Sequence, residues 1–229
     1  MFEIVPGILE KDWNEIEKKL EIVKPFAKSV HVDIIDGKFA PNTTFLDPTP
    51  FLKYSKDLLL EVHMMVDNPI QYLESFAKAG FKRFIGHIEK MPDQVEFVAK
   101  AQLLGEVGLA VDGPTAITDI KVPFEDLDTV LIMTIKAGES GQAFNSEYLE
   151  KIKIINSLQG EIKLPIEVDG GINDQTILPA SQAGALRFAS TSFIFDSHPQ
   201  AGGPEEKYLL LKNILEKSAF VKTMVDEGR

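Results

Sequence analysis

The sequence predicts a single (β/α)8 barrel, and three observations support that fold class. Eight short apolar segments alternate with longer amphipathic segments along the chain. The starts of the short segments lie roughly 20 to 36 residues apart, so a helix fits in each gap. The 229 residues suit one barrel, and no linker-like stretch divides them. An open doubly wound sheet is the alternative, but no glycine-rich nucleotide-binding loop follows the first apolar segment.

The eight apolar segments have the composition of strands that are covered on both faces. The predicted strands are residues 2–6, 29–34, 58–63, 83–87, 107–111, 129–134, 165–169 and 185–189. Helices are predicted to begin at Asp12 as a cap, at Asn68-Pro69 as cap and first-turn proline, and at Pro92, Asn145, Asn173 or Asp174, and Pro204. For residues 39–56 and for residues 112–128 the sequence predicts a loop with a short helix. We expect one domain over residues 1–229, with a helix end and a short frayed tail from about Ala219.

The charge balance limits the partners that we expect. The chain has 24 Lys and Arg against 35 Asp and Glu, a net charge of −11, and nucleic acids and anionic membranes select basic surfaces instead. An anionic small molecule needs only a local positive site. No apolar run approaches the roughly 18 residues of a transmembrane helix, so we expect a soluble, cytoplasmic protein. Without cysteine the chain has no disulfide, thiolate metal site or cysteine nucleophile.

Ionisable side chains gather at the predicted carboxyl ends of three strands, where barrel enzymes place their active sites. His31 and Asp33 end the second strand and share one face, because residues two apart on a strand point to the same side. Glu61-Val62-His63 ends the third strand and Glu167-Val168-Asp169 the seventh. Two imidazoles and two carboxylates form a mixed set that suits zinc, iron(II), manganese or cobalt. A structural role for each residue is the alternative, but four ionisable groups are costly to bury without a function.

The residues around these positions resemble the signature of ribulose-phosphate 3-epimerases, H-V-D-x-M-D-G-x-F-V-P-N. The chain reads H-V-D-I-I-D-G at 31–37 and F-A-P-N at 39–42. The similarity continues through V-H-M-M at 62–65, L-I-M-T at 131–134, G-Q at 141–142 and E-V-D-G-G-I at 167–172. The matches occur in chain order and cover nearly the whole predicted barrel.

The resemblance implies a metal-dependent inversion at C3 of a ketopentose 5-phosphate through a 2,3-enediolate. One divalent metal ion is then held by His31, Asp33, His63 and Asp169. Asp33 and Asp169 come from strands far apart in barrel order, so their carboxylates can flank a substrate and exchange the roles of base and acid. Three methionines are expected either to line the site or to serve barrel packing: Met64, Met65 and Met133. The resembled family is the only basis for expecting a homo-oligomer, a dimer or a hexamer.

The chain departs from the family pattern in four places. The first strand ends P-G-I-L at 6–9 instead of P-S-I-L, whose serine is thought to touch the substrate, and Ile35 replaces a methionine. The loop after the sixth strand reads K-A-G-E-S-G-Q at 136–142 instead of N-P-G-F-G-G-Q, and the last strand ends A-S-T at 189–191 instead of A-G-S or A-G-T. These two loops form the family's phosphate cradle, where Glu139 would repel a phosphate and Lys136 attract it. The residues expected to contact substrate are Gly7, Met65, Met133, Gly138, Gly141, Gly170, Gly171, Ser190 and Thr191.

The favoured function is the interconversion of D-ribulose 5-phosphate and D-xylulose 5-phosphate. The altered phosphate loops also permit an epimerase of another ketose or of a hexulose phosphate. A lyase or decarboxylase on a related barrel usually carries D-x-K-x-x-D, which D-I-I-D-G-K at 33–38 does not match. A catalytically inactive barrel is the last alternative, and retention of all four predicted metal ligands argues against it. Of the other histidines, His87 is expected to be structural and His198 solvated.

Overall fold

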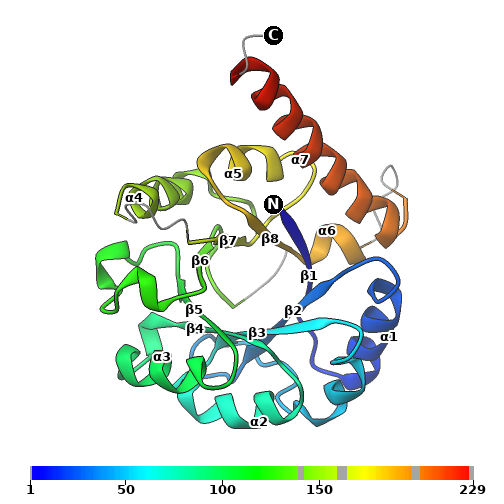
Figure 1. Cartoon of the computed structure of the whole chain (residues 1–229). Helices are drawn as coiled ribbons and strands as arrows, with labels where there is room; N and C mark the ends of the chain where they lie inside the picture. The colour runs from blue at the N-terminus through cyan, green and yellow to red at the C-terminus, as the bar shows by residue number, and fades with distance from the viewer. Residues whose placement is uncertain (1, 139–141, 159–163, 197–201, 227–229) are drawn as a thin grey trace.

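The computed structural model describes residues 2–138, 142–158, 164–196 and 202–226, the last seven as backbone. Parallel strands close into a barrel in chain order, from β1 to β8 and back to β1, with the helices outside (Figure 1). The strands are β1 (Glu3–Ile8), β2 (Ser29–Ile35), β3 (Leu59–Met65), β4 (Arg83–His87), β5 (Glu106–Val111), β6 (Thr129–Met133), β7 (Ile166–Asp169) and β8 (Arg187–Ser190). The predicted fold class is confirmed.

Helices cover the outside of the barrel between most strands. The α-helices are α1 (Trp13–Val23), α2 (Leu73–Lys78), α3 (Gln94–Gln102), α4 (Glu150–Leu158), α5 (Ile177–Ala183), α6 (Ser192–Phe195) and α7 (Pro204–Asp226). The 3₁₀ helices are η1 (Thr49–Tyr54), η2 (Pro69–Tyr72), η3 (Ile88–Lys90), η4 (Ile117–Asp119), η5 (Phe124–Asp126) and η6 (Ser146–Leu149). Only 3₁₀ helices stand between β2 and β3 and between β5 and β6, where the sequence predicts a loop with a short helix.

Helix starts follow the predicted caps in part. The Asp12 carboxylate accepts the Asn14 N–H at 2.9 Å, as expected of an N-cap. Asn68 stands at the N-cap of η2 with Pro69 in its first turn, as predicted, but its backbone is left-handed, with φ 51°, and its side chain makes no capping bond. The chain therefore passes through η2 before α2 begins. At α3 the capping side chain is Asp93, which accepts the Glu96 N–H at 2.9 Å.

The strands sort their side chains by alternation into an outer and an inner set. On β2, Val30, Val32 and Ile34 belong to the core between the strands and the helices. His31 and Asp33 lie on the opposite face, inside the barrel, and are also buried. Strand β2 therefore places its ionisable side chains at the barrel axis, while its apolar side chains still pack in the outer core.

The ends of the strands differ from the prediction by up to two residues. The first strand does not stop at Pro6: β1 pairs with β8 as far as Pro6 and then with β2 through Gly7 and Ile8. Proline has no backbone N–H to donate to a neighbouring strand. The strand nevertheless continues past Pro6, because Gly7 and Ile8 pair with the neighbour on the other side, β2. This extension places Gly7 level with His31 of β2.

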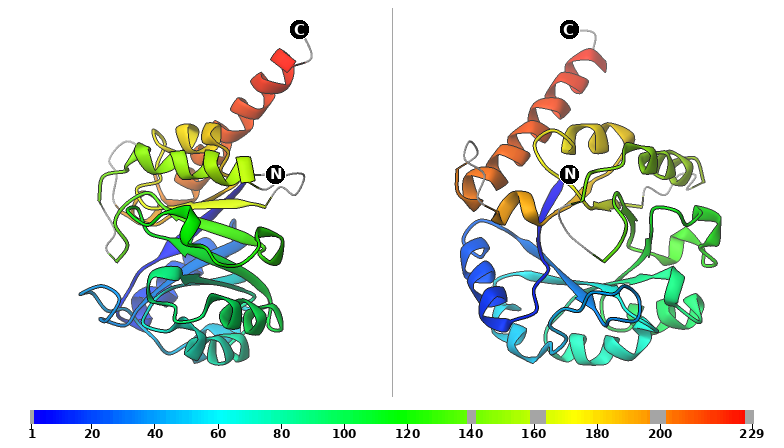
Figure 2. Two further views of the ribbon diagram at one scale, coloured as in Figure 1. Left: turned by 90° about the vertical axis from the view of Figure 1, so that its left-hand side faces the viewer. Right: turned by 180° about the vertical axis from the view of Figure 1, so that it is seen from behind.

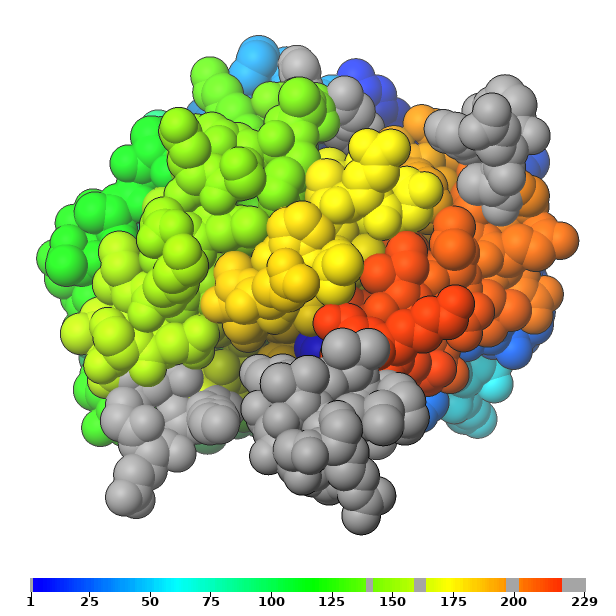
Figure 3. Space-filling model, turned by 90° about the horizontal axis from the view of Figure 1, so that it is seen from above, coloured from blue at the N-terminus to red at the C-terminus, as the bar shows by residue number. Residues whose placement is uncertain are grey.

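The C-terminal helix α7 continues to Asp226, past Ala219, where the sequence predicts the tail to begin. Leu211 and Leu215 are fully buried, and α7 packs against α5 and α6. Its last turns project beyond the barrel (Figures 1 and 2). Figure 3 shows α4, α5 and α7 side by side on the outer wall. Among the described residues, no helix is both long and apolar enough to cross a membrane.

Candidate active site

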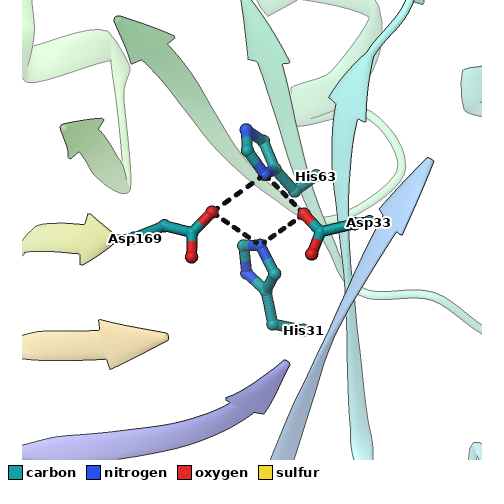
Figure 4. Close-up of side chains that lie close together, drawn as sticks. All are labelled: His31, Asp33, His63 and Asp169. Atoms are coloured by element: carbon teal, nitrogen blue, oxygen red, sulfur yellow. Dashed lines mark hydrogen bonds and ion pairs between the residues drawn. The ribbon is translucent and has the colours of Figure 1, made fainter. Parts of the chain in front are cut away.

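Four predicted ligands converge at the carboxyl ends of β2, β3 and β7: His31, Asp33, His63 and Asp169 (Figure 4). Asp33 Oδ1 lies 3.2 Å from His31 Nε2 and 2.8 Å from His63 Nδ1. Asp169 Oδ2 lies 4.0 Å from His31 Nε2 and 3.6 Å from His63 Nδ1. One donor atom from each side chain therefore faces a common point.

The donor set fits a divalent metal ion. Ligand atoms around a tetrahedral zinc with bonds of about 2.0–2.1 Å lie roughly 3.3 Å apart, and the four contacts above span 2.8–4.0 Å. All four residues are buried, and Asp33 and Asp169 also line a pocket. The set of two imidazoles and two carboxylates is typical of zinc, iron(II), manganese and cobalt sites.

Strand register explains why these residues meet. Asp33 of β2 pairs with His63 of β3, and both point to the barrel axis. Asp169 reaches the same point from β7, on the other side of His31 and His63 (Figure 4). The two carboxylates thus approach the site from opposite sides. Sequence spacing alone does not establish this placement.

The environments of the two carboxylates push their pKa values apart. Burial opposes ionisation of Asp33, but the neighbouring His31 and His63 outweigh it and hold the pKa of Asp33 below its usual range. Burial and the nearby Asp33 charge raise the pKa of Asp169 to about 6. Burial disfavours a charged His31, yet Asp33, Glu167 and Glu61 together hold the pKa of His31 well above its usual value.

A second layer of buried ionisable groups lies beneath the four ligands, and its role was not predicted from the sequence. His31 Nδ1 donates to Glu61 Oε1 at 2.5 Å, and Arg83 Nη1 donates to Glu61 Oε2 at 2.6 Å. Arg83 Nε in turn donates to Glu106 at 2.6 Å. Glu167 Oε1 lies 3.3 Å from His31 Nδ1, and burial together with Glu61 raises the pKa of Glu167 to about 8. Alternation was the available signal, because Glu61 and Glu167 stand two residues before His63 and Asp169.

Glu61 is expected to strengthen metal binding, because its bond to Nδ1 leaves the unprotonated Nε2 of His31 facing the metal position. Glu61→Gln should weaken zinc or cobalt affinity by roughly 10–100-fold in competition with a chromophoric chelator. Glu106→Gln is the matched control, since Glu106 contacts Arg83 and not the imidazole. Equal affinity of both variants and the parent would contradict this role.

The pocket beside the four ligands contains six of the residues expected to contact substrate: Met65, Met133, Gly138, Gly170, Gly171 and Thr191. Ser190 is not among the lining residues, because its hydroxyl points away and donates to the Ile172 carbonyl at 2.8 Å. Gly7 is also outside this lining. Met64 faces the outer core, as alternation with Met65 requires. Gly141 and Glu139 lie outside the described residues, as does His198.

The turn after β7 depends on two glycines. Gly170 has φ 113° and Gly171 has φ 68°, a left-handed region that favours glycine. A Cβ on Gly170 would lie 2.4 Å from Ile135, and one on Gly171 would lie 3.0 Å from Phe144. Both the backbone angles and the packing of Ile135 and Phe144 therefore require glycine at this turn.

His87 lies beside the site at the end of β4. Its Nδ1 donates to Glu89 at 2.9 Å, and its ring packs at tilted angles against His63 and Phe39, with centroid separations of 4.9 and 4.7 Å. Burial lowers the pKa of His87, so it supports the His63 ring as a neutral side chain.

Fold and site define the class of protein: a (β/α)8-barrel enzyme with two facing carboxylates and two imidazoles at the carboxyl ends of its strands. Residues 3–195 match the model of the Ribulose-phosphate 3 epimerase family, and the chain belongs to that family. It is therefore a sugar-phosphate epimerase, an enzyme of the isomerase class.

Curated relatives agree with this assignment over most of the chain. The ribulose-phosphate 3-epimerase of Bacillus subtilis is 33% identical over 202 residues, covering 85% of this chain and 93% of its own. The ribulose-phosphate 3-epimerase of Schizosaccharomyces pombe is 32% identical over 228 residues and covers 96% of both chains. Among solved structures, 3-keto-L-gulonate-6-phosphate decarboxylase from Vibrio cholerae superposes with a TM-score of 0.68 at 12% identity, covering 94% of this chain and 97% of its own. The last likeness shows the fold alone.

Proposed function

We propose that this enzyme interconverts D-ribulose 5-phosphate and D-xylulose 5-phosphate through a 2,3-enediolate. The observation that carries the proposal is the placement of Asp33 and Asp169 on opposite sides of one pocket. Inversion at a carbon next to a carbonyl requires removal of a proton from one face and delivery to the other. Two facing carboxylates meet that requirement.

The different pKa values of the two carboxylates support a division of labour. In the metal-free protein the pKa of Asp33 is held below its usual range and that of Asp169 is raised to about 6, so Asp33 is the stronger candidate for the base and Asp169 is the carboxylate that takes up a proton more readily. After one turnover the protonation states are exchanged, and the reverse reaction uses each group in the other role. The same pair therefore serves both directions.

His31, Asp33, His63 and Asp169 would hold one divalent ion, whether zinc, iron, manganese or cobalt. When bound, the ion supplies positive charge that stabilises the enediolate oxygens. Met65 and Met133 provide an apolar wall that keeps water from the reacting carbons.

The phosphate end of the substrate is expected at the turn after β7 and the end of β8. Gly170, Gly171 and Thr191 line the pocket there, and the glycines permit close backbone approach. Anion sites of barrels typically lie around strands 7 and 8. The resemblance is also the basis for proposing a cytoplasmic homo-oligomer that acts on small molecules.

A second candidate function is epimerisation of a hexulose phosphate or of a free ketose. The altered loop at 136–142 favours it, and so does Ser190, whose hydroxyl bonds to Ile172 and is not available to a phosphate. Incubation of metal-replete protein with ketose phosphates and free ketoses in deuterated water separates the two. We expect deuterium at C3 of ribulose 5-phosphate and inhibition by inorganic phosphate. Faster exchange into a free ketose, without phosphate inhibition, would replace the first proposal by the second.

Metal affinity is expected to rise with pH. His31 and Asp169 bind a metal only when deprotonated, and in the metal-free protein the pKa of Asp169 is about 6 while that of His31 is raised. Protonation of His31 therefore competes with the metal already above the usual imidazole range, and protonation of Asp169 adds to this competition below about pH 6. Titration of apoprotein with zinc from about pH 5.5 to 8 should show this trend together with proton release. Affinity independent of pH over that range would exclude these residues as the ligands.

A further inference from the structure

The peptide between Lys136 and Ala137 is held at both of its polar groups. Its C=O accepts a hydrogen bond from Gln142 Nε2 at 2.7 Å. Its N–H donates to Asp112 Oδ1 at 3.0 Å. Rotation of this peptide would therefore break both hydrogen bonds. The peptide stands at the start of the segment 136–142, which follows β6 and departs from the family pattern.

The carboxylate of Asp112 is itself fixed by its neighbours. The Asp112 N–H donates to Glu89 Oε1 at 2.7 Å, and the Asp112 C=O accepts from Lys151 Nζ at 2.6 Å. Oδ1, the oxygen that binds Ala137, also accepts the Gly113 N–H at 2.9 Å. Because η3 and α4 supply these contacts, the acceptor is already in place and loses little conformational entropy when it binds the loop.

The residue type at position 137 explains why an acceptor is needed here. The family pattern N-P-G-F-G-G-Q has a proline where this chain has Ala137. Proline has no N–H, and its ring fixes φ at about −65°. Alanine has a wider range of φ and brings an N–H that requires a partner. The bond to Asp112 supplies that partner and restrains the same peptide.

The restrained peptide leads directly to the substrate pocket. Gly138, the next residue, lines that pocket together with Asp33 and Asp169. Ala137 is buried beneath it, and the Gly138 C=O accepts from Asn42 Nδ2 at 3.2 Å. A shift of the peptide before Gly138 would therefore move one wall of the pocket.

We propose that Asp112 is a positioning residue, which holds the start of the segment 136–142 against the substrate pocket in place of the proline of the family pattern. This inference rests on the proposed epimerase function. Asp112 is not among the residues that line the pocket, so it acts through the loop backbone. Its loss should weaken substrate binding and leave proton transfer at Asp33 and Asp169 intact.

The first test compares Asp112→Ala with Asp112→Asn on the ketose that the wild-type protein epimerises. Asp112→Ala removes the acceptor, so the loop occupies its binding position for a smaller fraction of the time. For one lost hydrogen bond KM should rise roughly 3- to 10-fold, with kcat little changed. Asp112→Asn keeps an oxygen that can accept both N–H groups, so its KM should stay near the parent value. An unchanged KM in Asp112→Ala would overturn the proposal.

Asp128→Ala is the matched control. The Asp128 carboxylate accepts the Val107 N–H at 2.8 Å near the amino end of β5, whereas Asp112 follows the carboxyl end of that strand. Both alanine variants lose a carboxylate that binds a backbone N–H, so both should lower the melting temperature. Only Asp112→Ala should raise KM. A similar rise in Asp128→Ala would show that general destabilisation, and not loop position, sets KM.

The second test returns the proline of the family pattern. Ala137→Pro added to Asp112→Ala should lower KM again, because the ring restrains the same peptide and leaves no N–H without a partner. In the wild-type background Ala137→Pro should change KM little, since one restraint replaces the other. Absence of this rescue, while wild-type protein turns over a ketose, would refute only this inference. Absence of wild-type turnover on every ketose of the panel would refute the proposed function itself.

A third measurement does not depend on activity. Hydrogen exchange of the Ala137 amide, followed by NMR, should be faster in Asp112→Ala than in the parent protein, because the N–H has lost its acceptor. The rate in Asp128→Ala should equal that of the parent. Equal exchange in all three proteins would show that Asp112 does not restrain the loop.

Discussion

Asp33→Asn and Asp169→Asn should each abolish net epimerisation, with losses of at least about 100- to 10,000-fold in kcat, the range that general acid or base groups supply. Each variant keeps the carboxylate on one side of the pocket, so exchange of the C3 proton with solvent should persist from one epimer. Deuterium incorporation without inversion, followed separately for ribulose 5-phosphate and xylulose 5-phosphate, would identify which carboxylate serves which face.

Both carboxylates also belong to the predicted metal site, so the metal content of each variant must be measured first. A variant that loses both metal and activity reports on binding, whereas one that keeps its metal and loses inversion reports on proton transfer. Full turnover by either variant would refute the two-carboxylate assignment. Glu106→Gln, a change in the same barrel outside the pocket lining, is the control for general damage.

His63→Ala should lower zinc affinity by more than roughly 100-fold, since even outer partners of metal ligands contribute 10–100-fold. Elemental analysis of the parent protein should find one divalent ion per chain, and the variant should lose it on dialysis. Activity of the parent should disappear with a chelator and return with zinc, iron(II), manganese or cobalt. The readout besides activity is the melting temperature.

A bound ion raises the stability of the folded protein by about 2.7 kcal/mol when its concentration is 100 times Kd. Chelation should therefore lower the melting temperature of the parent and leave that of His63→Ala nearly unchanged. Active parent protein that contains no metal, or a melting temperature insensitive to chelation, would contradict the site.

Much of the fold could be predicted because the signals are local. Every predicted strand is present, because an apolar run of strand length can be recognised from its own residues, without knowledge of the strands that pair with it. The helix cap at Asp12 can be predicted for the same reason, because it depends only on neighbouring residues. Asn68 takes the predicted N-cap position, but its side chain makes no capping bond and its backbone is left-handed, a conformation that the local pattern does not record.

The four central residues of the candidate site were also accessible from sequence. All four stand at the ends of predicted strands, and His31 and Asp33 are two residues apart and so share a face. Because barrel sites lie at the carboxyl ends of the strands, these features predict that the four residues lie at one end of the molecule. The alternation of side chains along β3 also predicts that Met64 faces the outer core and Met65 the barrel interior. The same alternation places Glu61 inside the barrel, where it can bond to His31.

What the sequence by itself determined is the set of strands, their inward-facing ionisable residues and the family resemblance. Only the tertiary structure decided which groups meet: the Glu61 side chain with Arg83 across β3 and β4, and the Ser190 hydroxyl with the Ile172 carbonyl. The physical reason is that alternation fixes the face of a side chain within one strand. Strand register and barrel closure, which set the distance between side chains on different strands, arise from packing over the whole chain.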